Sequence, residues 1–151
     1  MIGTDSPTLG IVGAGQLGRM LGEAAAPLGV EVVVSDPTPD PPAAPVASES
    51  IAGGFEDRET IRAVAERSDY LTFEIELVDP DALEAVRAET GVPIHPDPET
   101  LRTIQDKLVQ KRRLAEAGIP VPPFRAVDDR ADLEAAIEAF GYPVMLKARE
   151  G

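Results

Sequence analysis

Cysteine is absent from the 151-residue sequence, which excludes disulfides, thiolate metal sites and thiol nucleophiles. His95 is the only histidine, so neither a histidine-rich metal site nor a Ser-His-Asp triad is favoured, and we assign His95 no role. No apolar run approaches the roughly 20 residues that a membrane span needs. No basic segment followed by an apolar one opens the chain as a secretory signal would. We therefore expect a cytoplasmic protein without a membrane partner.

Positive charge is also scarce, since 14 lysine and arginine residues face 27 aspartate and glutamate residues and leave a net charge of −13. A surface of that sign repels phosphate backbones, so we expect no nucleic acid polymer as a partner. Lysine occurs only at Lys107, Lys111 and Lys147. An acid-rich, lysine-poor surface resembles that of proteins adapted to high salt, where screening makes excess charge tolerable. An ordinary acidic protein is the alternative interpretation.

Short apolar runs rich in β-branched residues alternate with amphipathic stretches, which is typical of an α/β fold with a parallel sheet. We expect strands at residues 9–12, 30–35, 70–75, 92–94, 124–127 and 143–148. We expect helices at residues 19–28 and 131–140, and three more that begin at Asp57, Asp79-Pro80 and Asp97-Pro98. The second of these three should end near Gly91 and the third before Gly118. Residues 37–45 include five prolines and predict a loop.

A cluster of prolines at residues 120–123 marks the best candidate for a domain boundary. We expect a Rossmann-like domain at residues 1–96, a linking basic helix at 97–119 and the first part of a second domain at 120–151. The second domain would contain one strand, one helix and one strand before Gly151. Because such a fragment cannot cover its own sheet, we expect this domain to be incomplete.

Gly13, Gly15 and Gly18 form a G-x-G-x-x-G loop between a predicted strand and a predicted helix. Glycines at this spacing allow a tight turn, close approach of a phosphate group and close packing of the helix, whose free N–H groups attract an anion. Asp36 ends the next strand, where dinucleotide-binding folds hold a ribose hydroxyl. Three interpretations stay open: an NAD(P) site, a site for a phosphorylated metabolite, or a turn with no ligand.

Acidic residues end the predicted strand at residues 70–75. Thr72, Glu74 and Glu76 share one face of this strand, and such side chains point into the crevice where ligands bind parallel sheets. A carboxylate there accepts hydrogen bonds from ligand hydroxyl or amine groups. Glu74 is the better candidate, because Glu76 lies where the strand reaches solvent.

A basic segment interrupts the acidic chain. Residues 102–113 contain five basic side chains and one acidic one, a charge of +4 that leaves −17 for the remainder. Lys107 and Lys111 would share one helix face, which is unfavourable unless an anion lies nearby. Arg102 and Asp106 can pair across one turn. Lys147 lies within an apolar run, where a buried ammonium needs a counter-charge such as a nucleotide phosphate; an exposed edge strand is the alternative.

Several of these motifs together resemble a known enzyme family, the N5-carboxyaminoimidazole ribonucleotide synthetases of the PurK type, which belong to the ATP-grasp superfamily. The resemblance covers nearly the whole chain. It rests on the run Gly13 to Leu21, on Thr72-Phe73-Glu74-Ile75-Glu76, on Gln105-Asp106-Lys107 with Lys111, on Gly118-Ile119-Pro120 and on Val144-Met145-Leu146-Lys147.

The resemblance implies a pre-ATP-grasp domain followed by the start of an ATP-grasp domain. It also implies a reaction in which ATP phosphorylates bicarbonate to carboxyphosphate, and 5-aminoimidazole ribonucleotide is then carboxylated on its exocyclic amine. By matching positions, the ribonucleotide would be held by Gly15, Gln16, Leu17 and Glu74. Lys107 and Lys147 would hold the phosphates of ATP.

The resemblance further implies Mg²⁺ with ligands beyond residue 151, and a homodimer when full length. It assigns no catalytic or metal-binding residue within these 151 residues, so we expect the piece alone to be inactive. Two features depart from the family: the turn at residues 95–98, and the glycine-rich loop expected after Lys147, of which only Gly151 is present. A sister ATP-grasp ligase, resembling glycinamide ribonucleotide transformylase or biotin carboxylase, and a non-catalytic NAD- or nucleotide-binding module remain as alternatives.

Overall fold

A computed structural model describes residues 6–150 and divides the chain into two compact units, Met1–Leu101 and Arg102–Gly151. We describe each unit by itself. The predicted limits at residues 96 and 119 stay predictions, and Gly151, where we expected a glycine-rich loop to begin, lies outside the described residues.

The first unit is built on a parallel sheet, as predicted. Its strands run in the order β3-β2-β1-β4, so that β1 lies between β2 and β4. The four strands are β1 (Thr8–Val12), β2 (Glu31–Asp36), β3 (Glu49–Ala52) and β4 (Tyr70–Phe73). The strand expected at residues 92–94 is reduced to one bridge between Leu71 and Ile94.

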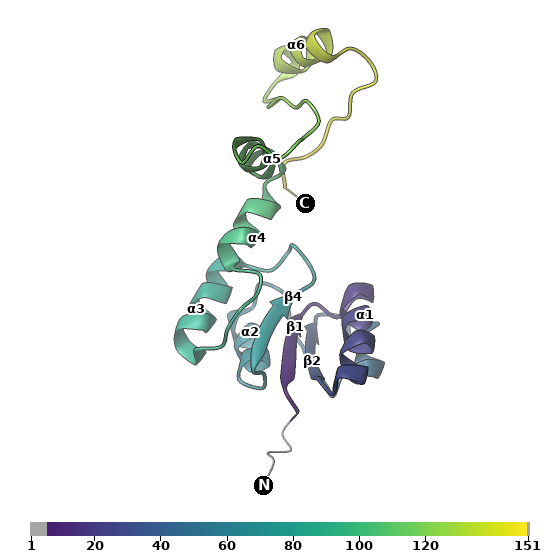
Figure 1. Ribbon diagram of the computed structural model, residues 1–151, viewed down its shortest axis with the longest axis vertical. Helices are drawn as coiled ribbons and strands as arrows, with labels where there is room; N and C mark the ends of the chain where they lie inside the picture. Colours follow the sequence, from purple (N-terminus) through teal and green to yellow (C-terminus); the bar gives the residue numbers. More distant parts are fainter. Residues whose placement is uncertain (1–5, 151) are drawn as a thin grey trace. The chain divides into compact units, whose positions relative to one another are not determined.

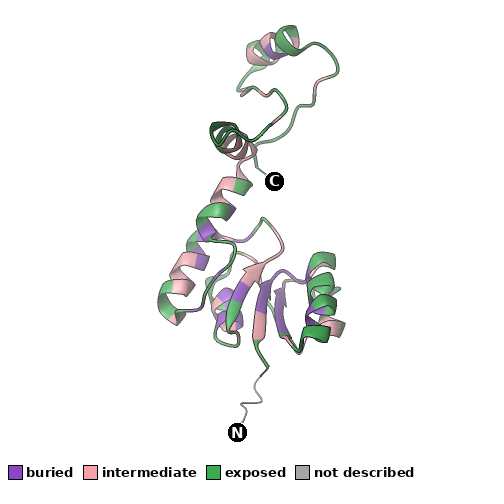
Figure 2. Ribbon diagram, in the orientation of Figure 1, coloured by how far each residue is buried: buried purple, intermediate pink, exposed green. Residues whose placement is uncertain are grey.

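Helices cover both faces of this sheet (Figure 1). On one face, Ile11 and Val34 pack in the cluster that also contains Ala25 of α1 (Gln16–Ala25). On the other, Val12 and Val33 pack in the cluster formed with α2 (Arg58–Ala65) and α3 (Pro80–Thr90). Successive strand residues therefore point to opposite layers, because side chains alternate along a strand. Buried residues gather along the strands and the inner sides of these helices (Figure 2).

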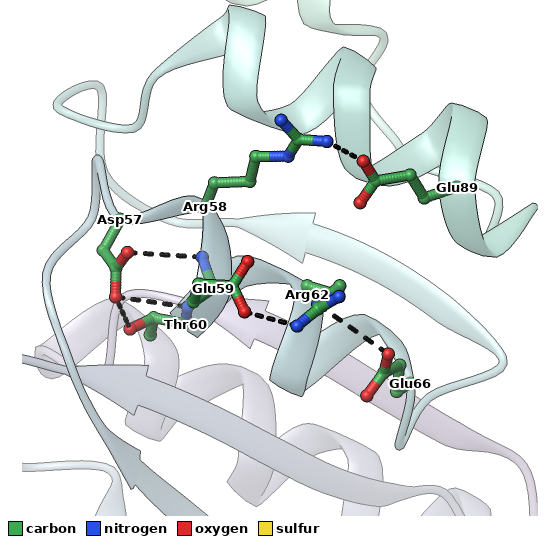
Figure 3. Close-up of polar contacts among 7 residues, drawn as sticks. All are labelled: Asp57, Arg58, Glu59, Thr60, Arg62, Glu66 and Glu89. Carbon is green, nitrogen blue, oxygen red and sulfur yellow. Dashed lines mark hydrogen bonds and ion pairs between the residues drawn. The ribbon is translucent and has the colours of Figure 1, made fainter.

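The predicted helix starts at Asp57 and Asp79 are confirmed. The Asp57 carboxylate accepts hydrogen bonds from the backbone N–H groups of Glu59 and Thr60 and from the Thr60 hydroxyl, the last at 2.6 Å (Figure 3). These bonds satisfy N–H groups that have no partner within the helix. Figure 3 also shows Arg58 at the start of α2 paired with Glu89 of α3, which ties the two helices together.

Two predictions for the first unit were wrong in their boundaries, and one strand was not predicted. β4 ends at Phe73 rather than at residue 75, so that Glu74 follows the strand. The helix expected from residue 19 begins at Gln16, and Pro27 confines its end to a 3-10 turn, Ala26–Leu28. The edge strand β3 was missed because Glu49–Ala52 contains one β-branched residue and is largely exposed.

The second unit contains α5 (Lys107–Glu116) and α6 (Arg130–Phe140), and α4 (Pro98–Gln105) spans the division between the units. The single helix predicted from residue 97 is broken because Asp106 adopts an extended backbone conformation and caps α5. The end of α6 at Gly141 is confirmed.

The strands predicted at residues 124–127 and 143–148 were wrong: within the described part of this unit both segments are irregular. Strands need ladder partners, and two short apolar segments joined by one helix do not make a stable sheet by themselves.

Candidate functional site

The order of the strands predicts a ligand-binding crevice at the carboxyl end of β1. The chain leaves β1 toward β2 and β3 on one side, and later returns to place β4 on the other side. At such a reversal the loops that follow the two adjacent strands diverge, and ligands of open α/β sheets bind there. In this unit the loops are the glycine loop after β1 and the segment that begins with Glu74 after β4.

Glu74 and the glycine loop are in direct contact across this crevice. The Oε1 atom of Glu74 accepts a hydrogen bond of 2.7 Å from the backbone N–H of Gly15. The N–H of Glu74 donates to the Val12 carbonyl at 3.1 Å, which places its backbone beside the end of β1. A Cβ on Gly15 would lie 2.9 Å from Oε1, so glycine is needed for this approach. Gly13 has a φ of 102°, a conformation that side chains disfavour.

The first turn of α1 follows directly. Gln16 and Leu17 open the helix with exposed side chains, and Leu17 is 56% exposed. No acidic side chain occurs in this turn. The backbone N–H groups of a first turn have no partner within their helix, and together with the helix dipole they attract an anion. Of the predicted ribonucleotide site, the structure therefore brings together the glycine loop, the start of α1 and Glu74.

Asp36 supports the loop from the opposite side. Its carboxylate accepts hydrogen bonds from the N–H of Ala14 at 3.1 Å and from that of Thr38 at 2.8 Å, and the residue is only 8% exposed. The side chain is thus engaged with its own chain at the place where a dinucleotide-binding fold would present it to a ribose. This arrangement favours the phosphorylated metabolite over the dinucleotide among the three interpretations of the loop.

The second unit contains a groove of about 800 Å³ that includes all three lysines in its lining. Lys107 and Lys111 enter it from α5, and Lys147 enters from the segment after α6. The Nζ atom of Lys111 lies 5.5 Å from the centre of the Phe124 ring, a cation–π arrangement. The apolar part of the lining includes Phe124, Val127, Leu133, Met145 and Leu146. The groove thus combines positive charge with apolar surface, as a nucleotide requires.

Our expectation of a buried Lys147 within a strand was wrong. Its side chain is exposed and its segment is irregular. Because water solvates the ammonium, no counter-charge is needed to explain its position. Its place beside Lys107 in the lining of the groove remains.

Asp106 links the two sides of the groove. Its carboxylate caps α5 by accepting from the N–H groups of Leu108 and Val109, and it also binds the guanidinium of Arg149. The hydrogen bond from Arg149 lowers the pKa of Asp106 from 3.8 to about 2. The same pair raises the pKa of Arg149. The sequence had suggested only a pairing of Asp106 with Arg102, and Arg149 was missed because it lies 43 residues away.

Among residues 6–150 no group of three or more histidine, cysteine, aspartate or glutamate side chains is arranged to hold a metal ion. The same part of the chain has no helix with the length and apolar character that crossing a membrane requires.

Comparisons with known proteins connect the part with the glycine loop and the part with the lysine-lined groove to one family. The ribonucleotide synthetase preATP-grasp domain family matches residues 7–105. The chain is 43% identical to a phosphoribosylaminoimidazole carboxylase of Ogataea methanolica over 148 residues, which covers 96% of the chain and 27% of that protein.

Solved structures agree. The N5-carboxyaminoimidazole ribonucleotide synthetase of Thermotoga maritima superposes with a TM-score of 0.82 and 46% identity over 96% of this chain and 39% of that one. The corresponding synthase of Aspergillus clavatus, solved with ADP and 5-aminoimidazole ribonucleotide, has a TM-score of 0.83 and 40% identity over 95% of this chain and 39% of that one. The chain thus spans less than two fifths of the length of these relatives.

Proposed function

The chain belongs to the ribonucleotide synthetase preATP-grasp family, and from this premise we propose that it is the N-terminal part of an ATP-dependent carbon–nitrogen ligase of purine biosynthesis. The whole enzyme would convert 5-aminoimidazole ribonucleotide, bicarbonate and ATP to N5-carboxyaminoimidazole ribonucleotide, ADP and phosphate. The relatives that carry this name favour it over the sister ATP-grasp ligases and over a non-catalytic module.

The contact between Glu74 and Gly15 is the observation that carries the proposal. It joins two motifs that are 59 residues apart into one crevice, with an anion-attracting helix start beside a carboxylate. A ribonucleotide offers both matching groups: its phosphate would bind the N–H groups at Gln16 and Leu17, and its amine or ribose hydroxyls would donate to Glu74.

The groove of the second unit supplies the second half of the proposal. Lys107 and Lys147 would bind ATP phosphates and stabilise the charge that develops as the γ-phosphoryl group moves to bicarbonate. An oxygen of bicarbonate would attack the γ-phosphorus and ADP would leave. The amine of the ribonucleotide would then attack the carboxyl carbon of carboxyphosphate, and phosphate would leave.

Four parts of this proposal concern the whole protein. We propose that bicarbonate is the carboxyl donor, that Mg²⁺ assists with ligands outside these residues, that the enzyme is a homodimer and that it is cytoplasmic. The proposal assigns residues 1–96 to the ribonucleotide and residues 120–151 to the beginning of the ATP-grasp domain, with α4 and α5 between them.

The test is steady-state kinetics of the full-length protein, with ADP release measured against each substrate. We expect release to require both bicarbonate and 5-aminoimidazole ribonucleotide. Glu74→Ala removes a hydrogen bond to a charged group, worth about 1.5–3 kcal/mol, and should raise the KM for the ribonucleotide about 10- to 150-fold. Lys147→Met should instead raise the KM for ATP.

Glu56→Gln is the control for Glu74, because Glu56 is exposed and follows β3, which β2 separates from β1. It should leave both KM values unchanged. Release of ADP that is independent of the ribonucleotide, or a Glu74→Ala enzyme with an unchanged KM, would overturn the proposal.

A further inference from the structure

Arg149 makes two separate contacts with the start of α5. Its guanidinium donates two hydrogen bonds to the Asp106 carboxylate, from Nε to Oδ1 at 3.3 Å and from Nη2 to Oδ2. Its carbonyl oxygen accepts a hydrogen bond of 2.9 Å from the backbone N–H of Lys107. We call this pair of contacts the Arg149 clasp. It joins residues 43 apart in the sequence.

The clasp connects the two lysines that line the groove. Lys107 is the residue directly after Asp106 and is itself held by its N–H, and Lys147 lies two residues before Arg149. Both lysines line the same groove, together with Arg149. The position of one lysine relative to the other therefore depends on the clasp, because the segment around residues 143–148 has no strand partner to hold it.

The pair of Arg149 and Asp106 can fix the orientation of the two side chains as well as their distance. An arginine binds a carboxylate with two parallel N–H···O bonds, which set orientation as well as distance, whereas a lysine acts as a point charge. The Arg149 side chain is 55% exposed. Asp106 is 15% exposed and is held in place by the two N–H groups that it caps.

We propose that Arg149 is a positioning residue for the nucleotide: through Asp106 and the Lys107 N–H it holds Lys107 and Lys147 on the same groove at the spacing that the phosphates of ATP require. This inference rests on the proposed function, since it assigns the groove to ATP. Arg149 acts through the two lysines.

The experiment uses four single variants of the full-length protein and the double variant that combines Arg149→Met with Asp106→Asn. Arg149→Met removes the guanidinium, and Arg149→Lys keeps the charge but not the fork. Asp106→Asn keeps an oxygen that can cap α5 and weakens the bond to Arg149. Arg130→Met is the matched control, because Arg130 is 90% exposed and pairs with Glu134 within α6.

A misplacement of about 1 Å lowers the rate up to about 100-fold, so we expect Arg149→Met and Asp106→Asn each to raise the KM for ATP at least about tenfold. The KM for the ribonucleotide should stay unchanged. The double variant should resemble the single ones, because both remove the same interaction. Arg149→Lys should restore part of the loss, and Arg130→Met should behave as the wild type.

A second measurement does not depend on ATP. Hydrogen exchange at the Lys107 amide should accelerate in Arg149→Met and not in Arg130→Met. Faster exchange with an unchanged KM for ATP would show a purely structural contact and overturn the proposal, as would additive effects in the double variant. A wild-type protein that binds no ATP would instead refute the proposed function, and this result is visible before any variant is made.

Discussion

The carboxylate of Glu74 accepts a hydrogen bond from the backbone N–H of Gly15, the residue that precedes the first turn of α1. Bonds of this kind, between an ionised acceptor and a backbone donor, are about twice as strong as neutral ones, and the positive end of the helix dipole strengthens them further. The position of Glu74 is therefore coupled to the loop. A change in one should alter binding at the other.

Gly15→Ala tests this coupling from the side of the loop. The φ of Gly15 is −72°, which alanine tolerates, so the only effect is a methyl group 2.9 Å from Oε1 of Glu74. We expect the carboxylate end of the Glu74 side chain to shift and the affinity for 5-aminoimidazole ribonucleotide to fall by up to about tenfold, since the shift is smaller than the misplacements of about 1 Å that cost about 100-fold. Isothermal titration calorimetry would measure this loss.

Gly54→Ala is the matched control for Gly15. Apart from the two neighbouring residues, no heavy atom of the described chain lies within 4 Å of a Cβ placed there. It should leave ribonucleotide affinity unchanged. Equal affinities for the Gly15→Ala and Gly54→Ala proteins would contradict the coupling.

Asp36→Ala tests how far the hydrogen bond from the Ala14 N–H to the Asp36 carboxylate stabilises the glycine loop. The change leaves the buried N–H group of Ala14 and the part-buried N–H group of Thr38 without their acceptor. An unsatisfied buried donor costs about 1–3 kcal/mol, so we expect the free energy of unfolding to fall by at least about that amount in urea denaturation. Asp36→Asn keeps an acceptor oxygen and should lose less stability.

The engagement of Asp36 with its own chain also predicts that the protein does not bind a dinucleotide. Fluorescence titration of the wild type with NADH should show no binding, and tight binding would restore the dinucleotide interpretation.

The sequence predicted the parts of the fold that local chemistry determines. Asp57 and Asp79 cap their helices as aspartates do, and Gly91 ends α3 in the left-handed conformation that glycine permits. The G-x-G-x-x-G loop identified the crevice, because glycines at that spacing follow a strand for a physical reason. The parallel sheet followed from the alternation of strands and helices.

The failures concern features that depend on distant parts of the chain. The segment containing Lys147 has the composition of a strand, but a strand forms only where a partner supplies hydrogen bonds. Asp106 has a basic neighbour one turn away, but the partner that the structure shows for it, Arg149, lies 43 residues along the chain. Neither outcome can be deduced from local spacing, since both require knowledge of which segments meet. The proximity of Glu74 to the glycine loop could be anticipated, because the strand order of this fold brings the two loops together.

The excess of acidic residues leads to a prediction about salt. With a net charge of −13, repulsion destabilises the folded chain, and raising NaCl from about 0.1 M to about 1 M shortens the Debye length from about 10 Å to about 3 Å. We expect the thermal unfolding midpoint to rise over this range.

A variant with fewer charges tests the cause of that rise. Glu31→Gln, Asp40→Asn and Glu56→Gln together remove three exposed negative charges. The triple variant should melt at a higher temperature than the wild type at low salt and should respond less to NaCl. An unfolding midpoint of the wild type that does not rise would favour an ordinary acidic protein over one adapted to salt.

The pair of Asp106 and Arg149 predicts how stability depends on pH. The folded pKa of Asp106 is about 2 and its ordinary value is 3.8, so folding favours the charged carboxylate. The stabilisation is fully present above the ordinary value and is lost as the pH falls through the folded one. The Asp106→Asn variant has no titrating group at this position, so it shows what the carboxylate contributes.

We expect the wild type to exceed this variant in melting temperature by a constant amount above about pH 5. The difference should shrink between about pH 4 and about pH 2. Scanning calorimetry of both proteins across this range measures the difference, in which the carboxylates common to both largely cancel. A difference that persists unchanged at pH 2, or that appears only below pH 4, would show that the charge of Asp106 does not stabilise the fold through Arg149.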